Sequence, residues 1–414
     1  MDKKTIIGIV LMSLIFIGYV VYNSKQQAEY QKYMEQVQAQ EQALAAEQQA
    51  EEAAAAELSD SLKQVAADLA AQREKDIFGE SLIAAKSGAE QTFTMANDLI
   101  TVDFSTRGGM MTKAVLADYT KYAPKDERNE LVSILDPESA MFDVEFYVKN
   151  GLNNVKVNTS EYVFASEGVR READRQVLDM RLEVAPGAYI VYEYILYNEQ
   201  NPSRDYLIDF NVKLENLSPI MAQQSTLGMM WSNRTYQNER SYKTENMYTT
   251  LSYRLPGEDD VEDLGISESD KSDNVASSVD WVSFKQQFFS SALIGRSTLL
   301  RAPQVSYATA EPKSGYLKDF AMSATVDYAP STTGYDFSFY LGPNKFAVLK
   351  KLADNNGKSL EMERIIPLGW VFSTYVSRYF VIPVFDFLQR YIANFGLIIL
   401  ILTVLVKLIV FPLT

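Results

Sequence analysis

Two runs of hydrophobic residues stand near the ends of the chain, and a long region of alternating polarity lies between them. The first run, residues 5–22, contains 18 residues and no charged side chain. Since a helix rises about 1.5 Å per residue, this run covers about 27 Å, close to the thickness of the hydrocarbon core of a bilayer. A cleaved signal peptide has a shorter apolar region, and no small-residue cleavage site follows this run. The pattern therefore favours an uncleaved transmembrane anchor over a cleaved signal.

The second run, residues 395–411, has one charged side chain, Lys407, among 17 residues and predicts a second transmembrane helix. Lys3 and Lys4 favour a cytoplasmic N-terminus, formed by residues 1–4. Lysines beyond the first run weaken that bias. With two spans, everything between them is expected outside the cytoplasm. The chain stops three residues beyond the second run, where membrane proteins seldom stop, so we expect it to be part of a longer chain.

Residues 23–90 are rich in alanine, glutamate and glutamine and connect the first run to the region of alternating polarity. All three residue types are good helix formers, so a solvated helix or a flexible, partly helical tether is expected. Apolar residues such as Tyr33, Val37 and Leu44 are too sparse to sustain the seam of a coiled coil. We interpret the segment as a spacer that holds a domain away from the membrane.

Residues 91–344 show a period of two in place of the helical period. The apolar positions that alternate with polar ones in three expected strands are Phe142, Val144, Phe146 and Val148; Tyr206, Ile208, Phe210, Val212 and Leu214; and Phe337, Phe339 and Leu341. Such strands bury one face and expose the other, as in antiparallel sandwiches. The pattern predicts one large all-β domain, with an acidic, solvated loop at residues 256–280.

Two helical segments are expected over residues 345–394, between the β domain and the second hydrophobic run. The first is a short helix at residues 345–353. The second is amphipathic, and its polar face is formed by Asp386, Gln389, Arg390 and Ala393. Aromatic and aliphatic residues cover the rest, so we expect this helix to lie in the membrane interface, with an interruption at Pro383. The alternative is a third span over residues 368–385, which would place Arg378 in the membrane at a high energetic cost.

The composition excludes several classes of chemistry. The chain has 414 residues without cysteine or histidine, so it offers no thiolate nucleophile, disulfide, Cys/His zinc site or imidazole relay. Its formal net charge of −15 argues against direct binding of nucleic acid. Carboxylates are numerous, but no spacing singles out a catalytic pair. We therefore predict that the chain is not an enzyme and needs no cofactor, with a carbohydrate-active sandwich as an alternative.

Three local patterns have a functional and a simpler structural interpretation. The glycine pair at residues 108–109 lacks the helix and the Lys-Ser/Thr pair of a phosphate loop, which favours a turn. Asp270 and Asp273 lack the frame of a calcium loop. Trp281 and the QQFF sequence at residues 286–289 could form an aromatic platform for a sugar, but a strand that packs its core explains them equally well.

Lys407 is the one ionisable residue deep in either hydrophobic run. Thr403 precedes it by one helical turn, and Gly396 falls on the same face, so these three residues form a stripe without aliphatic or aromatic side chains. One interpretation is that the lysine extends to the membrane surface. The other is that Lys407 and Thr403 face a polar cavity that receives a substrate.

Several short motifs occur in a fixed order along the chain. They are FSTRGG at residues 104–109, WVSFKQQFF at 281–289, YLGP at 340–343, LGW at 368–370 followed by Pro383, and KLIVFPLT at 407–414. Each is weak alone, but in this order, between two hydrophobic runs, they are specific. The layout resembles that of the YidC membrane protein insertases of Gram-negative inner membranes, which are related to the Oxa and Alb proteins. The resemblance covers nearly the whole chain.

The resemblance implies a periplasmic β-supersandwich attached to a multi-pass insertase in the bacterial inner membrane. Its partners would be nascent membrane proteins, components of the Sec translocon and the lipid bilayer. In the family a basic residue, usually arginine, lies in a hydrophilic groove of the transmembrane core. Lys407 occupies that position and keeps the charge without bidentate hydrogen bonding, and Thr403 matches a substrate-facing position. The remaining core spans are absent from this sequence.

The alternative function is a double-anchored periplasmic adaptor that binds a partner through its β domain and inserts nothing. The two functions predict different continuations of the gene beyond the second run. Four further apolar spans are expected for an insertase, whereas a stop codon is expected for the adaptor.

Overall fold

The computed structural model describes residues 60–124, 130–151, 153–198, 201–258, 260–265, 267, 269–354, 357–368, 375–392 and 394–410. The predicted anchor at residues 5–22 and the first part of the tether lie outside the described residues. The chain divides into two compact units, Met1–Asp76 and Ile77–Thr414. The helix α2 (Asp60–Lys86) contains one non-helical residue, Gly79, whose φ of 79° and ψ of 160° suit glycine.

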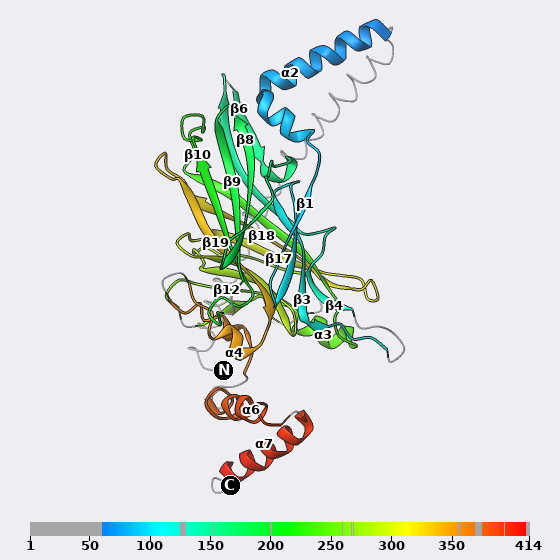
Figure 1. Ribbon diagram of the computed structural model, residues 1–414, viewed down its shortest axis with the longest axis vertical. Helices are drawn as coiled ribbons and strands as arrows, with labels where there is room; N and C mark the ends of the chain where they lie inside the picture. Colours follow the sequence, from blue (N-terminus) through cyan, green and yellow to red (C-terminus); the bar gives the residue numbers. More distant parts are fainter. Residues whose placement is uncertain are drawn as a thin grey trace, which may run out of the picture. The chain divides into compact units, whose positions relative to one another are not determined.

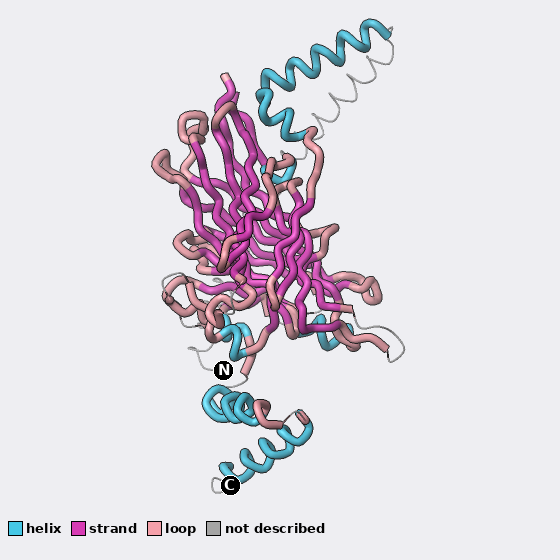
Figure 2. Tube along the Cα trace, viewed as in Figure 1, coloured by secondary structure: helices cyan, strands magenta, loops and turns pink. Residues whose placement is uncertain are grey.

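Antiparallel strands in three sheets make up most of the second unit (Figure 1 and Figure 2). The four-stranded sheet has the order β1-β2-β3-β4 and contains β1 (Thr92–Ala96), β2 (Ile100–Ser105), β3 (Met110–Thr120) and β4 (Leu131–Leu135). The six-stranded sheet has the order β14-β17-β18-β11-β5-β6 and contains β5 (Met141–Asn150), β6 (Asn153–Asn158), β11 (Thr226–Tyr236), β14 (Lys271–Asn274), β17 (Arg301–Thr309) and β18 (Tyr316–Asp327).

The nine-stranded sheet has the order β13-β12-β15-β16-β19-β10-β9-β8-β7. It contains β7 (Val169–Arg171), β8 (Arg175–Ala185), β9 (Ala188–Tyr197), β10 (Leu207–Glu215), β12 (Thr250–Arg254), β13 (Glu262–Asp263), β15 (Trp281–Lys285), β16 (Phe289–Gly295) and β19 (Gly334–Pro343). Two short helical elements, η1 (Thr159–Glu161) and α3 (Tyr242–Tyr248), lie between the strands in sequence.

An aromatic core joins the sheets. Trp231 of β11 stacks on Phe284 of β15 with ring centroids 3.9 Å apart, which connects the six-stranded and nine-stranded sheets. The ring centroids of Phe104 of β2 and Tyr194 of β9 lie 4.8 Å apart, which packs the four-stranded sheet on the same core. Aromatic pairs at these separations stabilise a core beyond the area that they bury. The predicted all-β sandwich is confirmed.

The alternating pattern predicted the buried positions of β5 and β10 but not all of their outer positions. Phe142 and Phe210 are buried as expected, yet Asp143 and Asp209, which were expected to face water, are buried too. Asp143 accepts hydrogen bonds from the Thr159 hydroxyl and the Ser160 backbone of η1, which covers this side of the strand. The predicted solvent-facing side is therefore wrong at both aspartates.

The acidic segment at residues 256–280 is also more ordered than predicted. It contains the short strands β13 and β14, which extend the edges of two sheets and are exposed throughout. Its aspartates have separate partners in the protein. Asp273 accepts a hydrogen bond from the Tyr253 hydroxyl at 3.0 Å, and Asp270 accepts one from the Thr309 backbone at 2.8 Å.

Helical elements follow the last strand. They are α4 (Phe346–Leu349), η2 (Met362–Ile365), the π-helical turn η3 (Ser377–Val381), α6 (Ile382–Leu388) and α7 (Phe395–Val410). The predicted interruption at Pro383 is wrong, because helical turns continue from residue 375 through Leu388. Pro383 is the second residue of α6 and follows the wider turn of η3, where its missing N–H is tolerated.

No helix in the described part of the chain combines the length and the apolar character needed to span a bilayer. The helix α7 covers nearly all of the predicted second span. The span itself, and the position of α6 in a membrane interface, stay predictions.

Candidate functional site

The helix α7 carries the residues that the sequence singled out. Thr403 and Lys407 are both exposed on α7, as is Gly396, so the helix brings the predicted stripe together on one face. The Thr403 hydroxyl donates to the Ile399 carbonyl at 2.8 Å, which satisfies it within the helix. Ile398 is fully buried. The structure therefore places the two polar side chains where another molecule can reach them, and their role in substrate binding stays a prediction.

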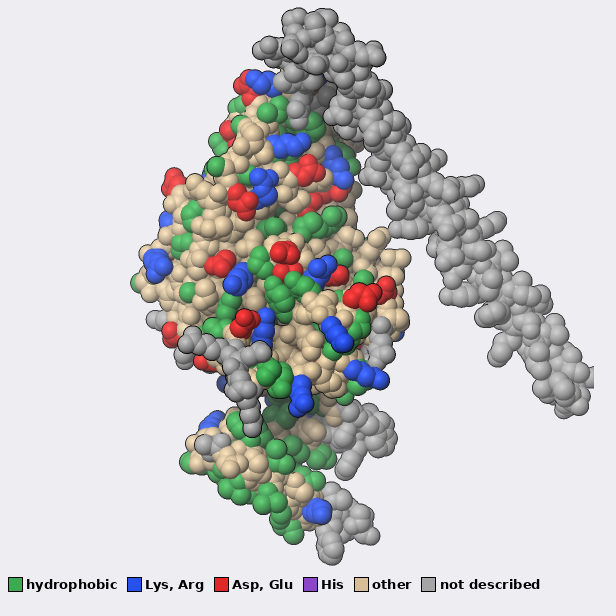
Figure 3. Space-filling model, turned by 90° about the vertical axis from the view of Figure 1, so that its right-hand side faces the viewer, with side chains coloured by type: hydrophobic (Ala, Val, Ile, Leu, Met, Phe, Trp, Pro, Cys, Tyr) green, Lys and Arg blue, Asp and Glu red, His purple; other side chains and the backbone are tan. Residues whose placement is uncertain are grey.

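The segments around this stripe expose many large hydrophobic side chains. They are Tyr375, Tyr379, Phe387, Tyr391, Phe395, Leu397, Ile399, Leu400, Val404 and Leu408. Figure 3 shows hydrophobic side chains gathered over the described C-terminal helices, at the lower end of the view. Soluble monomers rarely expose a contiguous apolar surface of this kind, and such surfaces mark contacts with a membrane or a partner protein.

A partly buried ion pair connects η3 to η2. The guanidinium of Arg378, in η3, pairs with the carboxylate of Glu363, in η2, and lies over the ring of Phe346 at 5.7 Å. Arg378 was expected to be costly in a membrane span. Here it has a carboxylate partner of its own, and both the interfacial helix and the third span stay predictions.

Arg254, at the end of β12, anchors the chain just before η2. Its guanidinium lies 3.1 Å from Asp280 and 3.1 Å from Glu361, and its Nε donates to the Glu258 carbonyl. The indole N–H of Trp281 donates to the Leu360 carbonyl at 3.1 Å. The interpretation of Trp281 as part of a surface platform is therefore wrong, because its ring is fully buried and its one donor is already used.

The glycine pair at residues 108–109 forms a turn between β2 and β3, as predicted. Gly109 has φ of +60°, and a Cβ there would lie 3.0 Å from the ring of Tyr192 and 3.1 Å from that of Phe164. The Tyr194 hydroxyl donates to the Gly109 carbonyl at 2.8 Å. Only glycine fits this conformation and this close approach, so the turn is a packing element.

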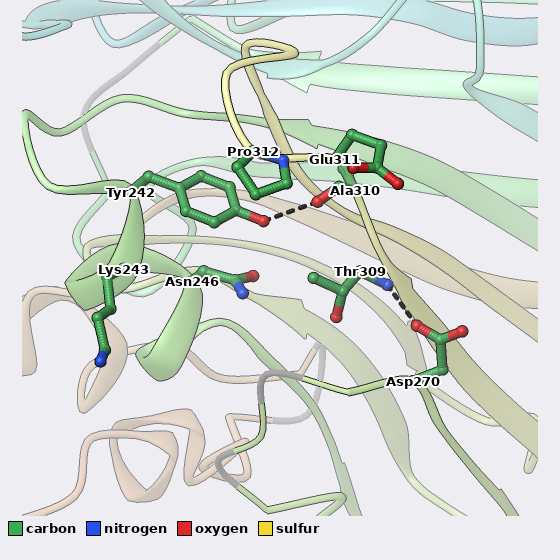
Figure 4. A pocket seen from close by; sticks show the side chains of 8 residues that line it. All are labelled: Tyr242, Lys243, Asn246, Asp270, Thr309, Ala310, Glu311 and Pro312. Atoms are coloured by element: carbon green, nitrogen blue, oxygen red, sulfur yellow. Dashed lines mark hydrogen bonds between the residues drawn. The ribbon is translucent and has the colours of Figure 1, made fainter.

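A cavity of about 480 Å³ lies beside α3, β17 and the turn that follows β17 (Figure 4). Its lining residues are Tyr242, Lys243, Asn246, Asp270, Thr309, Ala310, Glu311 and Pro312. Two hydrogen bonds hold its wall together, from the Tyr242 hydroxyl to the Ala310 carbonyl and from the Thr309 N–H to Asp270. Sequence reasoning missed this cavity, because its residues come from three separate segments that share no motif.

Two buried ionisable groups of the β domain, Glu245 and Lys318, have strongly perturbed pKa values. Burial raises the pKa of Glu245, on α3, to about 7, although its carboxylate accepts hydrogen bonds from the Asn238 and Glu239 backbones. Burial lowers the pKa of Lys318 to about 8. The ammonium group of Lys318 donates to the Thr249 and Ser267 carbonyls, so backbone dipoles hold it. Both groups titrate near neutral pH.

The sequence model of the family described as the YidC periplasmic domain matches residues 92–382. This chain belongs to the YidC family. The match covers the three sheets, η2 and η3, and the helix α7 lies beyond it.

The chain is similar over its whole length to curated members of the YidC family. It is 32% identical over 424 residues to the "Membrane protein insertase YidC" of Parabacteroides distasonis, and 32% identical over 434 residues to that of Porphyromonas gingivalis. Each alignment covers 100% of this chain and 63% of the relative. The chain therefore spans less than two thirds of the length of these relatives, which are named as insertases and not as enzymes.

Two solved structures show a weaker likeness. The crystal structure of YidC from Thermotoga maritima is 12% identical, with a TM-score of 0.31, over 79% of this chain and 70% of that one. A galactose mutarotase related enzyme from Lactobacillus acidophilus is also 12% identical, with a TM-score of 0.36, over 61% of this chain and 97% of that one. Likeness at this level does not bear on the function.

Proposed function

We propose that the chain is the N-terminal part of a membrane protein insertase and chaperone of the bacterial inner membrane. The observation that carries this proposal is the match along the whole chain to curated insertases of the YidC family. The exposed hydrophobic side chains around α6 and α7 support it, because they need a bilayer or further helices to cover them.

The proposed layout follows the hydrophobic pattern of the sequence. Residues 1–4 are cytoplasmic, residues 5–22 anchor the chain, and residues 23–90 are the tether. Residues 91–344 form the periplasmic domain, and the segment from 345 to 394 ends in the interfacial helix. Residues 395–411 form the second transmembrane span, the first of the insertase core. A bilayer about 30 Å thick suits a helix of this length when flanking residues adjust to it.

In the proposed mechanism Lys407 receives the polar or acidic part of a substrate on its way across the bilayer. An exposed backbone or side-chain polar group costs several kcal/mol in hydrocarbon, so a polar surface inside the membrane lowers the barrier to insertion. In a partly desolvated groove the ammonium group attracts a carboxylate more strongly than it does in water. Thr403, one turn away on the same face, adds a hydroxyl to this surface.

The proposed partners are nascent membrane proteins, the lipid bilayer and the Sec translocon, with insertion occurring with or without Sec. No cofactor takes part, since the proposed mechanism changes the solvation of a segment and breaks no covalent bond. The apolar helices α6 and α7 are the surfaces that we assign to contact with lipid or with further core helices.

The test is insertion of a single-span substrate by the complete gene product in proteoliposomes. Substrates carry an acidic or a neutral translocated tail, and protease protection of the tail reports insertion. Lys407→Arg should retain insertion, Lys407→Ala should reduce it for the acidic tail, and Lys407→Glu should abolish it for that tail. Lys149→Glu, an exposed lysine on β5, is the control with the same charge change.

Two outcomes would remove parts of this proposal. If Lys407→Glu inserts the acidic tail as well as the parent, the lysine does not act on the substrate and extends to the membrane surface instead. If the parent inserts neither tail, with or without Sec, the insertase function fails and the periplasmic adaptor becomes the better assignment.

A further inference from the structure

The cavity beside α3 contains two buried oxygen atoms that have no hydrogen-bond partner among the described residues. They are Asn246 Oδ1 and Thr309 Oγ1. Asn246 is only 2% exposed, and Figure 4 shows its amide group directed toward Thr309 across the cavity. Nearly all buried polar atoms in native proteins have a partner, because an unpaired one destabilises the fold. Two such atoms that face one cavity point to a ligand.

The remaining groups around the cavity are mostly hydrogen-bond acceptors. Asp270 and Glu311 contribute carboxylates, which only accept when ionised. Two donors on the same wall are already used, since the Tyr242 hydroxyl and the Thr309 N–H donate within the protein. The Asn246 amide nitrogen and the Thr309 hydroxyl can also donate. Figure 4 shows the side chain of Lys243 extending away from Thr309 and Asp270. A ligand that supplies donors can satisfy the two carboxylates and the two unpaired oxygen atoms together.

We propose that this cavity binds an organic cation rich in N–H donors, such as a guanidinium or a primary ammonium group. The N–H groups of the cation donate to Asn246 Oδ1 and Thr309 Oγ1, and the carboxylate of Asp270 balances the charge. Charge-assisted hydrogen bonds of this kind are stronger than neutral ones. Tyr242 adds an aromatic ring to the wall, and aromatic rings attract cations. The volume suits a small ligand.

This assignment goes beyond the proposed insertase function and does not depend on it. Two sources provide the chemistry, a basic side chain of a peptide or a free polyamine. An arginine side chain enters with its backbone and so needs the open side of the cavity, whereas a polyamine enters alone.

The test is isothermal titration calorimetry on the full chain in detergent. The probes are an arginine tripeptide with blocked ends, spermidine, and methyl glucoside as a neutral polyol. We expect binding of at least one cationic probe, and the stronger of the two identifies the source. Asn246→Leu, which replaces the amide with an apolar group of the same number of heavy atoms, should weaken that binding about tenfold or more. Asp270→Asn keeps an acceptor for the Thr309 N–H and should weaken it by a similar factor.

The matched control is Glu167→Gln, which makes the same charge change at an exposed position outside the cavity and should bind as the parent does. Thermal unfolding shows whether each variant folds, and Asp270→Asn decides the outcome alone if Asn246→Leu does not. The proposal is overturned if neither cation binds, if the folded variants bind like the parent, or if methyl glucoside binds in preference to both cations.

Discussion

The sandwich buries charged side chains, whereas the C-terminal helices expose large hydrophobic side chains. In the sandwich Lys318, Glu245 and Asp209 are at most 2% exposed, whereas in the helices Leu408 is 65% exposed and Tyr391 75% exposed. Charged side chains are seldom buried without partners, and large hydrophobic surfaces are seldom left uncovered in water. The sandwich therefore holds these buried charged groups with partners from this chain. The helices depend on something outside it, which agrees with a bilayer or further core helices.

The network around Asp209 shows how the sandwich compensates a buried charge. One carboxylate oxygen accepts from the Ser338 hydroxyl at 2.7 Å, and the other lies 3.3 Å from a guanidinium nitrogen of Arg296. Arg204 pairs with the same carboxylate. Removing one member of such a network leaves the others buried and uncompensated, which destabilises the fold more than the intact network stabilises it.

The largest effect is expected from Asp209→Ala. This change leaves the buried guanidinium of Arg296 without a buried carboxylate beside it. The free energy of unfolding should therefore fall by about 3–5 kcal/mol. Urea unfolding followed by tryptophan fluorescence measures it, since Trp231 and Trp281 lie in the core. The control is Asp327→Ala, which breaks the exposed pair with Arg301 and should cost less than about 1 kcal/mol. Equal losses for the two variants would contradict the contrast between buried and exposed charge.

A second prediction uses the pH dependence of the buried carboxyl group of Glu245. Its folded pKa of about 7 lies above the ordinary value of 4.5. The folded state therefore binds this proton more tightly than the unfolded state, and the stability that Glu245 contributes in this way is fully present below pH 4.5. It is lost as the pH rises to 7, by on the order of 3 kcal/mol.

Glu245→Gln should flatten this part of the pH curve, because the amide stays neutral at every pH. The measurement is urea unfolding of parent and variant between pH 4.5 and 8. Glu167→Gln, at an exposed carboxylate, should leave the curve of the parent unchanged. A slope that survives in Glu245→Gln would show that another group causes it.

A third, smaller effect is expected from Gly109→Ala. The left-handed backbone at φ of +60° and the approach of the Tyr192 ring both oppose a Cβ at this turn, so the free energy of unfolding should fall by about 1–3 kcal/mol. Gly187→Ala is the matched control, because φ is +76° there but no atom lies within 4 Å of the new Cβ. If the two variants lose the same stability, backbone strain alone accounts for the result and the packing against Tyr192 contributes nothing.

The sequence predicted what depends on local pattern and missed what depends on distant partners. Alternation identified the strands around Phe142 and Phe210, and the apolar run at residues 395–411 predicted α7 almost to its ends. The pairing of β10 with β19 joins segments more than a hundred residues apart, which no local pattern encodes. The burial of Asp209 follows from that pairing, because Ser338 lies opposite it.

The candidate sites divide in the same way. Lys407 and Thr403 could be placed on one helical face from their spacing, and the structure shows both exposed there. Their role in binding a substrate stays a prediction. Asn246 and Thr309 come together only through the fold, and a single buried asparagine has no signature in sequence.

The smallest effect on the fold is expected from replacing two highly exposed tyrosines of the C-terminal segment. Tyr379 and Tyr391 expose 68% and 75% of their surface, so replacing both with serine removes few contacts within the protein. The free energy of unfolding of the sandwich should change by less than about 0.5 kcal/mol.

The same double variant should bind less well to liposomes of inner-membrane lipid, because aromatic side chains anchor a helix at the level of the headgroups. Flotation of residues 91–394 with liposomes measures that binding, because either proposed span would hold the full chain on the liposome by itself. Tyr122→Ser, at a half-exposed tyrosine of the β domain, should float like the parent. If the double variant instead destabilises the sandwich and leaves flotation unchanged, these rings stabilise the fold. In that case the two regions do not differ in whether they face water or a membrane.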